Sequence, residues 1–211
     1  MEYVQNVKVQ RNRQSFKDPI HCYSMLTFLV CLSLWVLNHP YLGIIHDSRL
    51  YALQALHKIY PHYFAGELHL QFTAQNKFTI FPQLYAFVIE QLGLTTGTQV
   101  LYLFFTISWF ASIWYLLQTL LPHHSKWLTT GGVLLLSKKY HIIGFAEPFL
   151  TPRLGAEALV LLAIALLLRE KKQLSFALLI LALLFHPLMA IGGWLFCGLY
   201  VYYLSPQKKT I

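Results

Sequence analysis

The sequence predicts an all-α membrane protein in which several helices cross the bilayer. Of its 211 residues, 56% are hydrophobic and only 11% are charged, whereas a soluble domain carries about 25% charged residues. The mean hydropathy of +0.51 is too apolar for a surface in water. Leu-rich runs such as Ala156–Leu168 favour helices over membrane strands, which alternate in polarity. We expect five to seven membrane helices in one domain over residues 21–204.

The basic residues lie beside the apolar segments and do not form one charged face. The net charge is +8. This arrangement is typical of orientation signals and of contact with anionic lipid headgroups, and it does not favour nucleic acid as a partner. The polar tail 1–20 is then cytoplasmic, and the plasma (inner) membrane is the expected location. The other basic groups are Lys138-Lys139, Arg169–Lys172 and the C-terminal tail 205–211, which simple alternation of crossings cannot all place in the cytoplasm.

The first predicted membrane helix, 20–38, leads into an outer loop over residues 39–78. This loop holds five of the ten histidines. Within it, apolar residues recur every three positions, which predicts a helix over 47–60 that lies on the membrane surface. The repeating residues are Leu50, Leu53, Leu56 and Ile59.

Beyond the outer loop, apolar runs and their boundary residues predict further helices. Pro82 and Pro152 suit first helical turns, and Gly93 suits a helix end. The stretch 127–137 is apolar but too short to cross a membrane. The run 173–204 is too long for one helix and has two candidate breaks, so two helices are expected there. The predicted helices are 81–92, 99–121 and 152–168, with two more that meet near His186-Pro187 and Gly192-Gly193.

Two short polar segments interrupt this apolar chain. The first is His46-Asp47-Ser48-Arg49, and the second is Glu147–Arg153. Three of the eight carboxylates fall in or just after them: Asp47, Glu147 and Glu157. A charge near lipid is costly unless it faces a partner, a cavity or the water interface. We therefore expect any functional site at these two polar segments.

In the first polar segment, Asp47 has two compatible interpretations. It stands at the start of the predicted surface helix, where an Asp accepts hydrogen bonds from the first amides. It also suits a catalytic carboxylate at the outer face, as a base on an acceptor hydroxyl or as a ligand of a metal or a pyrophosphate-linked donor. Arg49 opposes the dipole of the same helix. It needs an anionic partner, such as a headgroup, a lipid-phosphate substrate or a carboxylate.

The second polar segment repeats this pattern. Thr151 suits the N-cap of the helix that begins at Pro152. Arg153 again lies at the positive end of a helix dipole, and it can pair with Glu157 one turn later. The alternative partners of Arg153 are Glu147, at a bend before a proline, and an anionic ligand.

Histidines and cofactor motifs give weaker signals. His186 precedes Pro187 in a Leu-rich run, where it either satisfies a backbone group near the proline or belongs to a substrate site. The spacing of His57 and His62 does not predict a metal site. The sequence identifies no cofactor, and it has no nucleotide-binding or hydrolase motif.

The order of these parts resembles the N-terminal membrane module of the GT-C class of glycosyltransferases. The matching features are the first helix, the segment 46–51 with the surface helix to Tyr60, and the helix entry at 79–85. The stretches 147–157 and 184–189 resemble motifs of uncharacterised bacterial proteins of this architecture. The resemblance implies sugar transfer from a polyprenyl-phosphate carrier at the outer face, by an enzyme or a truncated relative. Asp47 would take the place of the first-loop acid, and the candidate substrate-binding residues are Arg49, Glu147, Arg153, Glu157 and His186.

A different class of function stays open. In a non-catalytic membrane subunit that binds lipid or a partner protein, the polar segments are helix caps and headgroup contacts. A small transporter is a third possibility, because Glu90, Glu157 and His186 are ionisable groups within apolar segments. The positions of Asp47 and Arg153 in space distinguish the enzyme from the other two classes. A single catalytic site requires the two residues to converge on one face.

Overall fold

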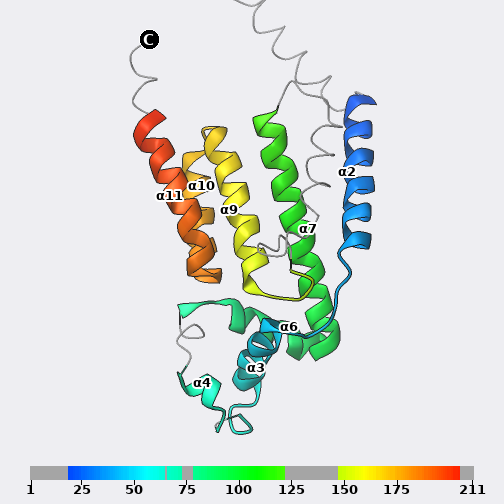
Figure 1. Ribbon diagram of the computed structural model, residues 1–211, viewed down its shortest axis with the longest axis vertical. Coiled ribbons are helices and arrows are strands. Elements are labelled where there is room, and N and C mark those ends of the chain that lie inside the picture. The colour runs from blue at the N-terminus through cyan, green and yellow to red at the C-terminus, as the bar shows by residue number, and fades with distance from the viewer. Residues whose placement is uncertain (1–18, 65, 73–77, 122–146, 205–211) are drawn as a thin grey trace, which may run out of the picture. The chain divides into compact units, whose positions relative to one another are not determined.

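The computed structural model describes residues 19–64, 66–72, 78–121 and 147–204, and these residues form helices and connecting loops without a strand (Figure 1). The chain separates into two compact units, Met1–Asn38 and His39–Ile211. The described helix of the first unit is α2 (Pro19–Asn38). The second unit contains α3 (Asp47–Ile59), α4 (Leu68–Phe72), α6 (Phe81–Leu92), α7 (Leu94–Leu120), α9 (Pro152–Leu168), α10 (Lys172–Phe185) and α11 (Pro187–Leu204).

Helices α6 and α9 occupy the residues that the sequence predicts, whereas α7 begins at Leu94 rather than at Gln99. The early start has two causes. The Thr98 hydroxyl donates to the Leu94 carbonyl and shares a hydrogen bond of 2.5 Å with the Tyr85 hydroxyl. A Cβ atom at Gly97 would lie 3.1 Å from the Val88 carbonyl oxygen, so a glycine lets α7 approach α6 closely. Thr98 is therefore helical with its hydroxyl satisfied by the Leu94 carbonyl and the Tyr85 hydroxyl.

The apolar run near the C-terminus divides where His186-Pro187 predicts a break. Gly192 and Gly193 do not break the chain, and both lie inside α11. A Cβ atom at Gly193 would lie 2.7 Å from Cγ1 of Val160 and 3.0 Å from Cδ2 of Leu179. The second candidate break is thus a point where α11 packs tightly on its neighbours, since a glycine leaves room for their side chains.

Helix α9 is the centre of the packing. It contacts α7, α10 and α11, while α6 packs on α7 and α3 packs on α6. Figure 1 shows α3, α4 and α6 gathered at the end of the second unit where α9 begins. A buried core of small and apolar side chains joins α9, α10 and α11: Ala163, Leu167, Leu179 and Cys197.

Helix α3 does not bury the row of apolar residues that predicted it. Its buried face consists of Ser48, Tyr51, Ala52, Gln54 and Ala55. The two alanines let the helix pack closely, and the Tyr51 ring meets the Phe81 ring edge-on at a centroid distance of 5.6 Å. Leu50 is exposed, and the other residues of the predicted row are only partly buried. The three-residue repeat correctly predicted a helix, and a different face of that helix packs against the protein.

One described helix, α7, is long and apolar enough to cross a membrane. Its 27 residues include a window of mean hydropathy 1.8. Shorter apolar helical stretches are Met25–Asn38 within α2, Lys172–Phe185, which is α10, and Pro187–Tyr203 within α11. Several predictions fall outside the described residues, namely those for the N-terminal tail up to residue 18, the apolar stretch 127–137, the region 140–146 and the C-terminal tail 205–211.

Candidate functional site

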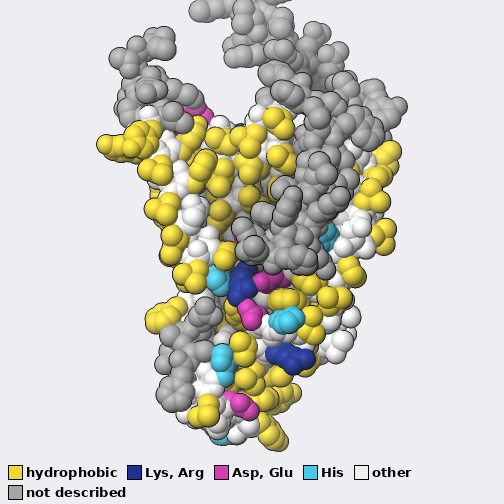
Figure 2. Space-filling view, in the orientation of Figure 1, with side chains coloured by type: hydrophobic (Ala, Val, Ile, Leu, Met, Phe, Trp, Pro, Cys, Tyr) yellow, Lys and Arg dark blue, Asp and Glu magenta, His cyan; other side chains and the backbone are white. Residues whose placement is uncertain are grey.

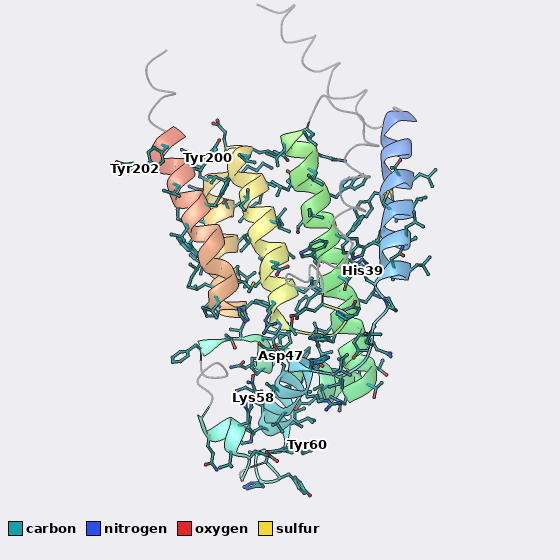
Figure 3. All side chains as sticks on the ribbon, viewed as in Figure 1. His39, Asp47, Lys58, Tyr60, Tyr200 and Tyr202 are labelled. Atoms are coloured by element: carbon teal, nitrogen blue, oxygen red, sulfur yellow. The ribbon has the colours of Figure 1, made fainter. Side chains whose placement is uncertain are left out.

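The two polar segments come together in the second unit. The Leu42 amide donates to the Pro148 carbonyl at 2.8 Å, which joins the loops that carry the segments. The His46 and Phe149 rings lie 5.7 Å apart between centroids. Figure 2 shows charged and histidine side chains gathered in the middle of one face, below the apolar surface of the long helices. Figure 3 places Asp47 at this level, beneath the start of α9.

Arg153 joins the two segments through its guanidinium. Its Nη2 atom lies 2.6 Å from Oδ2 of Asp47, and its Nη1 atom lies 2.6 Å from Oε1 of Glu147. Oε2 of Glu147 accepts a hydrogen bond of 2.6 Å from the Thr151 hydroxyl. We call Asp47, Glu147, Thr151 and Arg153 the carboxylate cluster. With both acids ionised it carries one net negative charge, because one guanidinium faces two carboxylates.

The two carboxylates of this cluster differ in how many of their oxygens accept hydrogen bonds and in how exposed they are. Glu147 uses both oxygens, and its side chain is 22% exposed. Asp47 uses Oδ2 and is 43% exposed. Within the described part of the chain, Oδ1 of Asp47 has no hydrogen-bond partner. Asp47 is therefore the cluster's acceptor toward solvent or a ligand, whereas Glu147 is held within the protein.

The predicted helix cap at Asp47 is wrong. Asp47 is the first residue of α3, and His46 holds the N-cap position without a side-chain cap. The Asp47 carboxylate instead pairs with Arg153, which stands 106 residues later in the sequence. His46 has φ 46, a left-handed conformation that costs about 1 kcal/mol or more in a residue other than glycine. The turn directs the first polar segment toward α9.

Two predictions for the second polar segment are also corrected. Thr151 holds the N-cap position of α9 but makes no side-chain cap, and its hydroxyl donates to Glu147. Arg153 does not pair with Glu157 on its own helix; it pairs with Glu147 and Asp47. The alternative that Arg153 reaches Glu147 is confirmed. The bend at Pro148 makes this possible, since it turns the chain back toward the start of α9.

Arg49 is separate from the carboxylate cluster. Its Nε atom donates to the Ile44 carbonyl at 3.4 Å, and the side chain is exposed. Arg49 and Arg153 were both predicted in the first turn of a helix, yet their contacts differ. Arg153 has two carboxylate partners, whereas Arg49 has a backbone contact within its own loop.

Glu157 lines a separate pocket one turn further along α9. Its Oε2 atom accepts a hydrogen bond of 3.1 Å from the indole nitrogen of Trp109 on α7. The pocket has a volume of about 190 Å³, and its described lining is otherwise apolar. It lies between α7, α9 and α11, and is lined by Trp109, Ile113, Glu157, Val160, Leu161 and Met189.

His186 is buried at the junction of α10 and α11. Its Nδ1 atom accepts a hydrogen bond of 3.4 Å from the Met189 amide, one of the uncapped amides of α11. The imidazole thus satisfies a neighbouring donor rather than the carbonyl that Pro187 leaves free. The proton of the neutral ring is then on Nε2.

Tyr51 is a site residue that the sequence reasoning missed. It is buried on α3, one turn after Asp47, and within electrostatic range of Asp47, Glu147 and Arg153. Burial raises the pKa of the Tyr51 phenol, the Arg153 guanidinium opposes this, and the carboxylates add to it. The four-residue spacing from Asp47 was a usable signal, because such residues share a helix face. Trp109, missed as the donor to Glu157, had no comparable signal.

The net negative charge of the carboxylate cluster favours hydrogen-bond donors over anions as ligands. Each terminal nitrogen of Arg153 faces a carboxylate, and the net negative charge of the cluster opposes the approach of an anion. Among the described residues, no group of three or more His, Cys, Asp or Glu side chains is placed to hold a metal. A hydroxyl or amine that approaches Oδ1 of Asp47 meets an acceptor whose position Arg153 fixes.

No protein-family model, curated protein or solved structure matches the chain.

Proposed function

We propose that the chain is a polytopic membrane protein that acts as a GT-C-like glycosyltransferase, or a truncated relative, at the outer face of the plasma membrane. Support for the membrane comes first from the surface of α10 and α11. Large apolar side chains are exposed along both helices, among them Phe176, Ile180, Leu188 and Leu195. Figure 2 shows that apolar side chains cover the upper part of the visible face, above the charged side chains. In water such a surface would be costly, whereas lipid covers it.

The distribution of charge along α9 supports an orientation. Arg153 in its first turn and Arg169 just after its end are about 24 Å apart along the axis, close to the thickness of a bilayer core. Figure 1 shows α9 and α11 ending at the same end, where α10 begins. The basic residues Arg169, Lys171 and Lys172 lie there and favour the cytoplasm. The carboxylate cluster then lies at the outer interface.

The observation that carries the enzymatic proposal is the ion pair of Asp47 with Arg153, which engages Oδ2 and leaves Oδ1 of Asp47 without a hydrogen-bond partner among the described residues. In the proposed reaction, this oxygen accepts the proton of the acceptor hydroxyl as the hydroxyl oxygen bonds to the anomeric carbon. The bond from that carbon to the phosphate oxygen breaks, and the polyprenyl phosphate leaves with the electron pair. Arg153 positions Asp47, and the exposed Arg49 faces the phosphate of the donor.

The test is sugar transfer by the full chain in proteoliposomes with a panel of polyprenyl-phosphate-linked hexoses and membrane-derived acceptors. We expect Asp47→Asn to lower release of polyprenyl phosphate at least a hundredfold, because an amide cannot take the proton. Glu67→Gln, an exposed acid in the same loop, is the matched control and should retain activity. The enzymatic proposal fails if wild type transfers nothing, or if Asp47→Asn is as active as Glu67→Gln.

A non-catalytic membrane subunit is the second candidate, and one observation favours it. Arg153, Glu147 and Thr151 satisfy one another within the protein, as a structural junction between the two loops would. This candidate predicts that Asp47→Asn and Arg153→Ala act through stability alone. Co-purification of one reproducible membrane partner, lost in an Arg153→Ala variant that stays folded, would support it over the enzyme.

A further inference from the structure

The turn between α9 and α10 carries three cations in consecutive or nearly consecutive positions. They are Arg169, Lys171 and Lys172, and all three are exposed. We call this group the basic turn. It lies at the end of α9 opposite the carboxylate cluster, so it takes no part in the site described above.

The structure holds Arg169 in one orientation. Its guanidinium carbon lies 4.2 Å from the centre of the Tyr115 ring, and its Nε atom donates to the Thr119 hydroxyl at 3.0 Å. That hydroxyl in turn donates to the Tyr115 carbonyl at 2.8 Å, which fixes the acceptor. Both partners belong to α7. Among the described residues, the two terminal nitrogens of Arg169 have no hydrogen-bond partner, and they are the pair that binds a phosphate bidentately.

The backbone of the turn is fixed as well. The Lys171 amide donates to the Leu166 carbonyl and the Glu170 amide donates to the Leu167 carbonyl, each at 2.9 Å. These two bonds form a Schellman motif, in which glycine is the usual residue at the left-handed position. Glu170 occupies that position with φ 64. Arg169 and Lys171, on either side of Glu170, therefore project from a turn whose backbone is held by hydrogen bonds.

The neighbouring surface indicates where the phosphate comes from. Leu174 and Phe176 follow the basic turn and are exposed at the start of α10. At the same end, Figure 3 labels Tyr200 and Tyr202 on α11, and Tyr202 is largely exposed. Tyrosines beside an apolar surface are typical of the level of lipid headgroups. A phosphate held here would belong to a molecule whose acyl chains cover that apolar surface.

We propose that the basic turn is a binding site for the headgroup of an anionic phospholipid in the cytoplasmic leaflet, with Arg169 as its main ligand. This proposal rests on the membrane placement proposed above. Arg169 binds the phosphate through its terminal nitrogens, and Lys171 adds charge beside it. The site gives the protein a preference for anionic over zwitterionic lipid at this end, independent of any transfer chemistry.

The test is native mass spectrometry of the full chain released from nanodiscs that contain phosphatidylcholine with or without phosphatidylglycerol. We expect the wild type to retain phosphatidylglycerol, and Arg169→Gln to reduce that retention roughly fivefold. Lys58→Gln is the matched control, because Lys58 is an exposed cation on α3 at the other end, as Figure 3 shows. It should change nothing.

Misfolding could also lower lipid retention in Arg169→Gln, so a second variant is designed to bind more lipid than the wild type. Glu170→Gly removes an acid from the basic turn and suits φ 64, so it should retain more phosphatidylglycerol than the wild type. Equal retention in Arg169→Gln and Lys58→Gln would overturn the proposal, and so would release of the lipid by millimolar inorganic phosphate. A chain that does not enter nanodiscs contradicts the membrane placement, whereas one that enters without a lipid preference contradicts this inference alone.

Discussion

Arg153 and Asp47 are 106 residues apart in the sequence, yet their side chains form an ion pair of 2.6 Å. The pair connects the first loop of the second unit to the start of its central helix. Because Arg153 also binds Glu147, one guanidinium holds both polar segments in place.

A double-mutant cycle measures this coupling. We expect Asp47→Ala and Arg153→Ala to interact by about 1 to 2 kcal/mol in unfolding free energy, since the pair is only partly exposed and charge-assisted. The measurement is reversible unfolding in mixed micelles. A cycle of Asp47→Ala with Arg169→Ala is the control and should show no coupling. Asp47 lies beside the start of α9, whereas Arg169 follows its end. Coupling of the same size in both cycles would contradict a local ion pair.

The two acids of the carboxylate cluster should differ in their effect on stability. Glu147 has two partners and is less exposed than Asp47, so Glu147→Gln loses more hydrogen bonding than Asp47→Asn. We expect the lower melting temperature for Glu147→Gln, measured by thermal unfolding in detergent. The reverse order would mean that Asp47 is the structural acid and would count against its role toward a ligand.

The paired glycines of α11 give a test of the packing. Gly193→Ala should destabilise the protein by about 1 to 3 kcal/mol, because the added methyl group meets Val160 and Leu179. Gly192→Ala is the control, since a Cβ atom at Gly192 meets nothing within 4 Å. It should be neutral or stabilise α11 slightly. Unfolding by denaturant in detergent compares the two, and equal losses would exclude the close approach of α11 to α9 and α10.

Tyr51 predicts a pH dependence above neutrality. Its phenol has a raised pKa in the folded protein because of burial, so the folded state keeps a proton that the unfolded state loses near pH 10. The raised pKa of Tyr51 therefore adds to the free energy of unfolding. This contribution is fully present below pH 10 and is lost as the pH rises through the pKa of Tyr51 in the folded protein. The difference in phenolate absorbance between wild type and Tyr51→Phe should therefore titrate above pH 10.

The charges around Tyr51 provide the control for that titration. Arg153→Gln should move the transition to higher pH, because the guanidinium lowers the pKa of Tyr51, and Asp47→Asn should move it to lower pH. Shifts in the same direction for both variants would show that Tyr51 senses general loosening of the fold rather than these two charges.

The sequence by itself determined the helices whose boundaries are marked locally. Proline in the first turn and glycine at the end suffice for α6, and Thr151-Pro152 suffices for the start of α9. The break at His186-Pro187 follows from the proline ring alone. The sequence also singled out the two polar segments as the place to expect a site, because an unpaired charge is costly in an apolar chain, and the fold brings these segments together.

Only the tertiary structure decided which of these charges meet. Asp47 and Thr151 each had a local helix cap in the sequence, and each has a different partner in the fold. Arg153 had Glu157 one turn away, and it pairs instead with Glu147, the predicted alternative, and with Asp47. Helix capping and pairs one turn apart stabilise by about 1 kcal/mol or less, which is no more than a charge-assisted hydrogen bond provides. Loop contacts that join residues a hundred positions apart therefore override the local choice, and they leave Oδ1 of Asp47 as the acceptor that the carboxylate cluster presents.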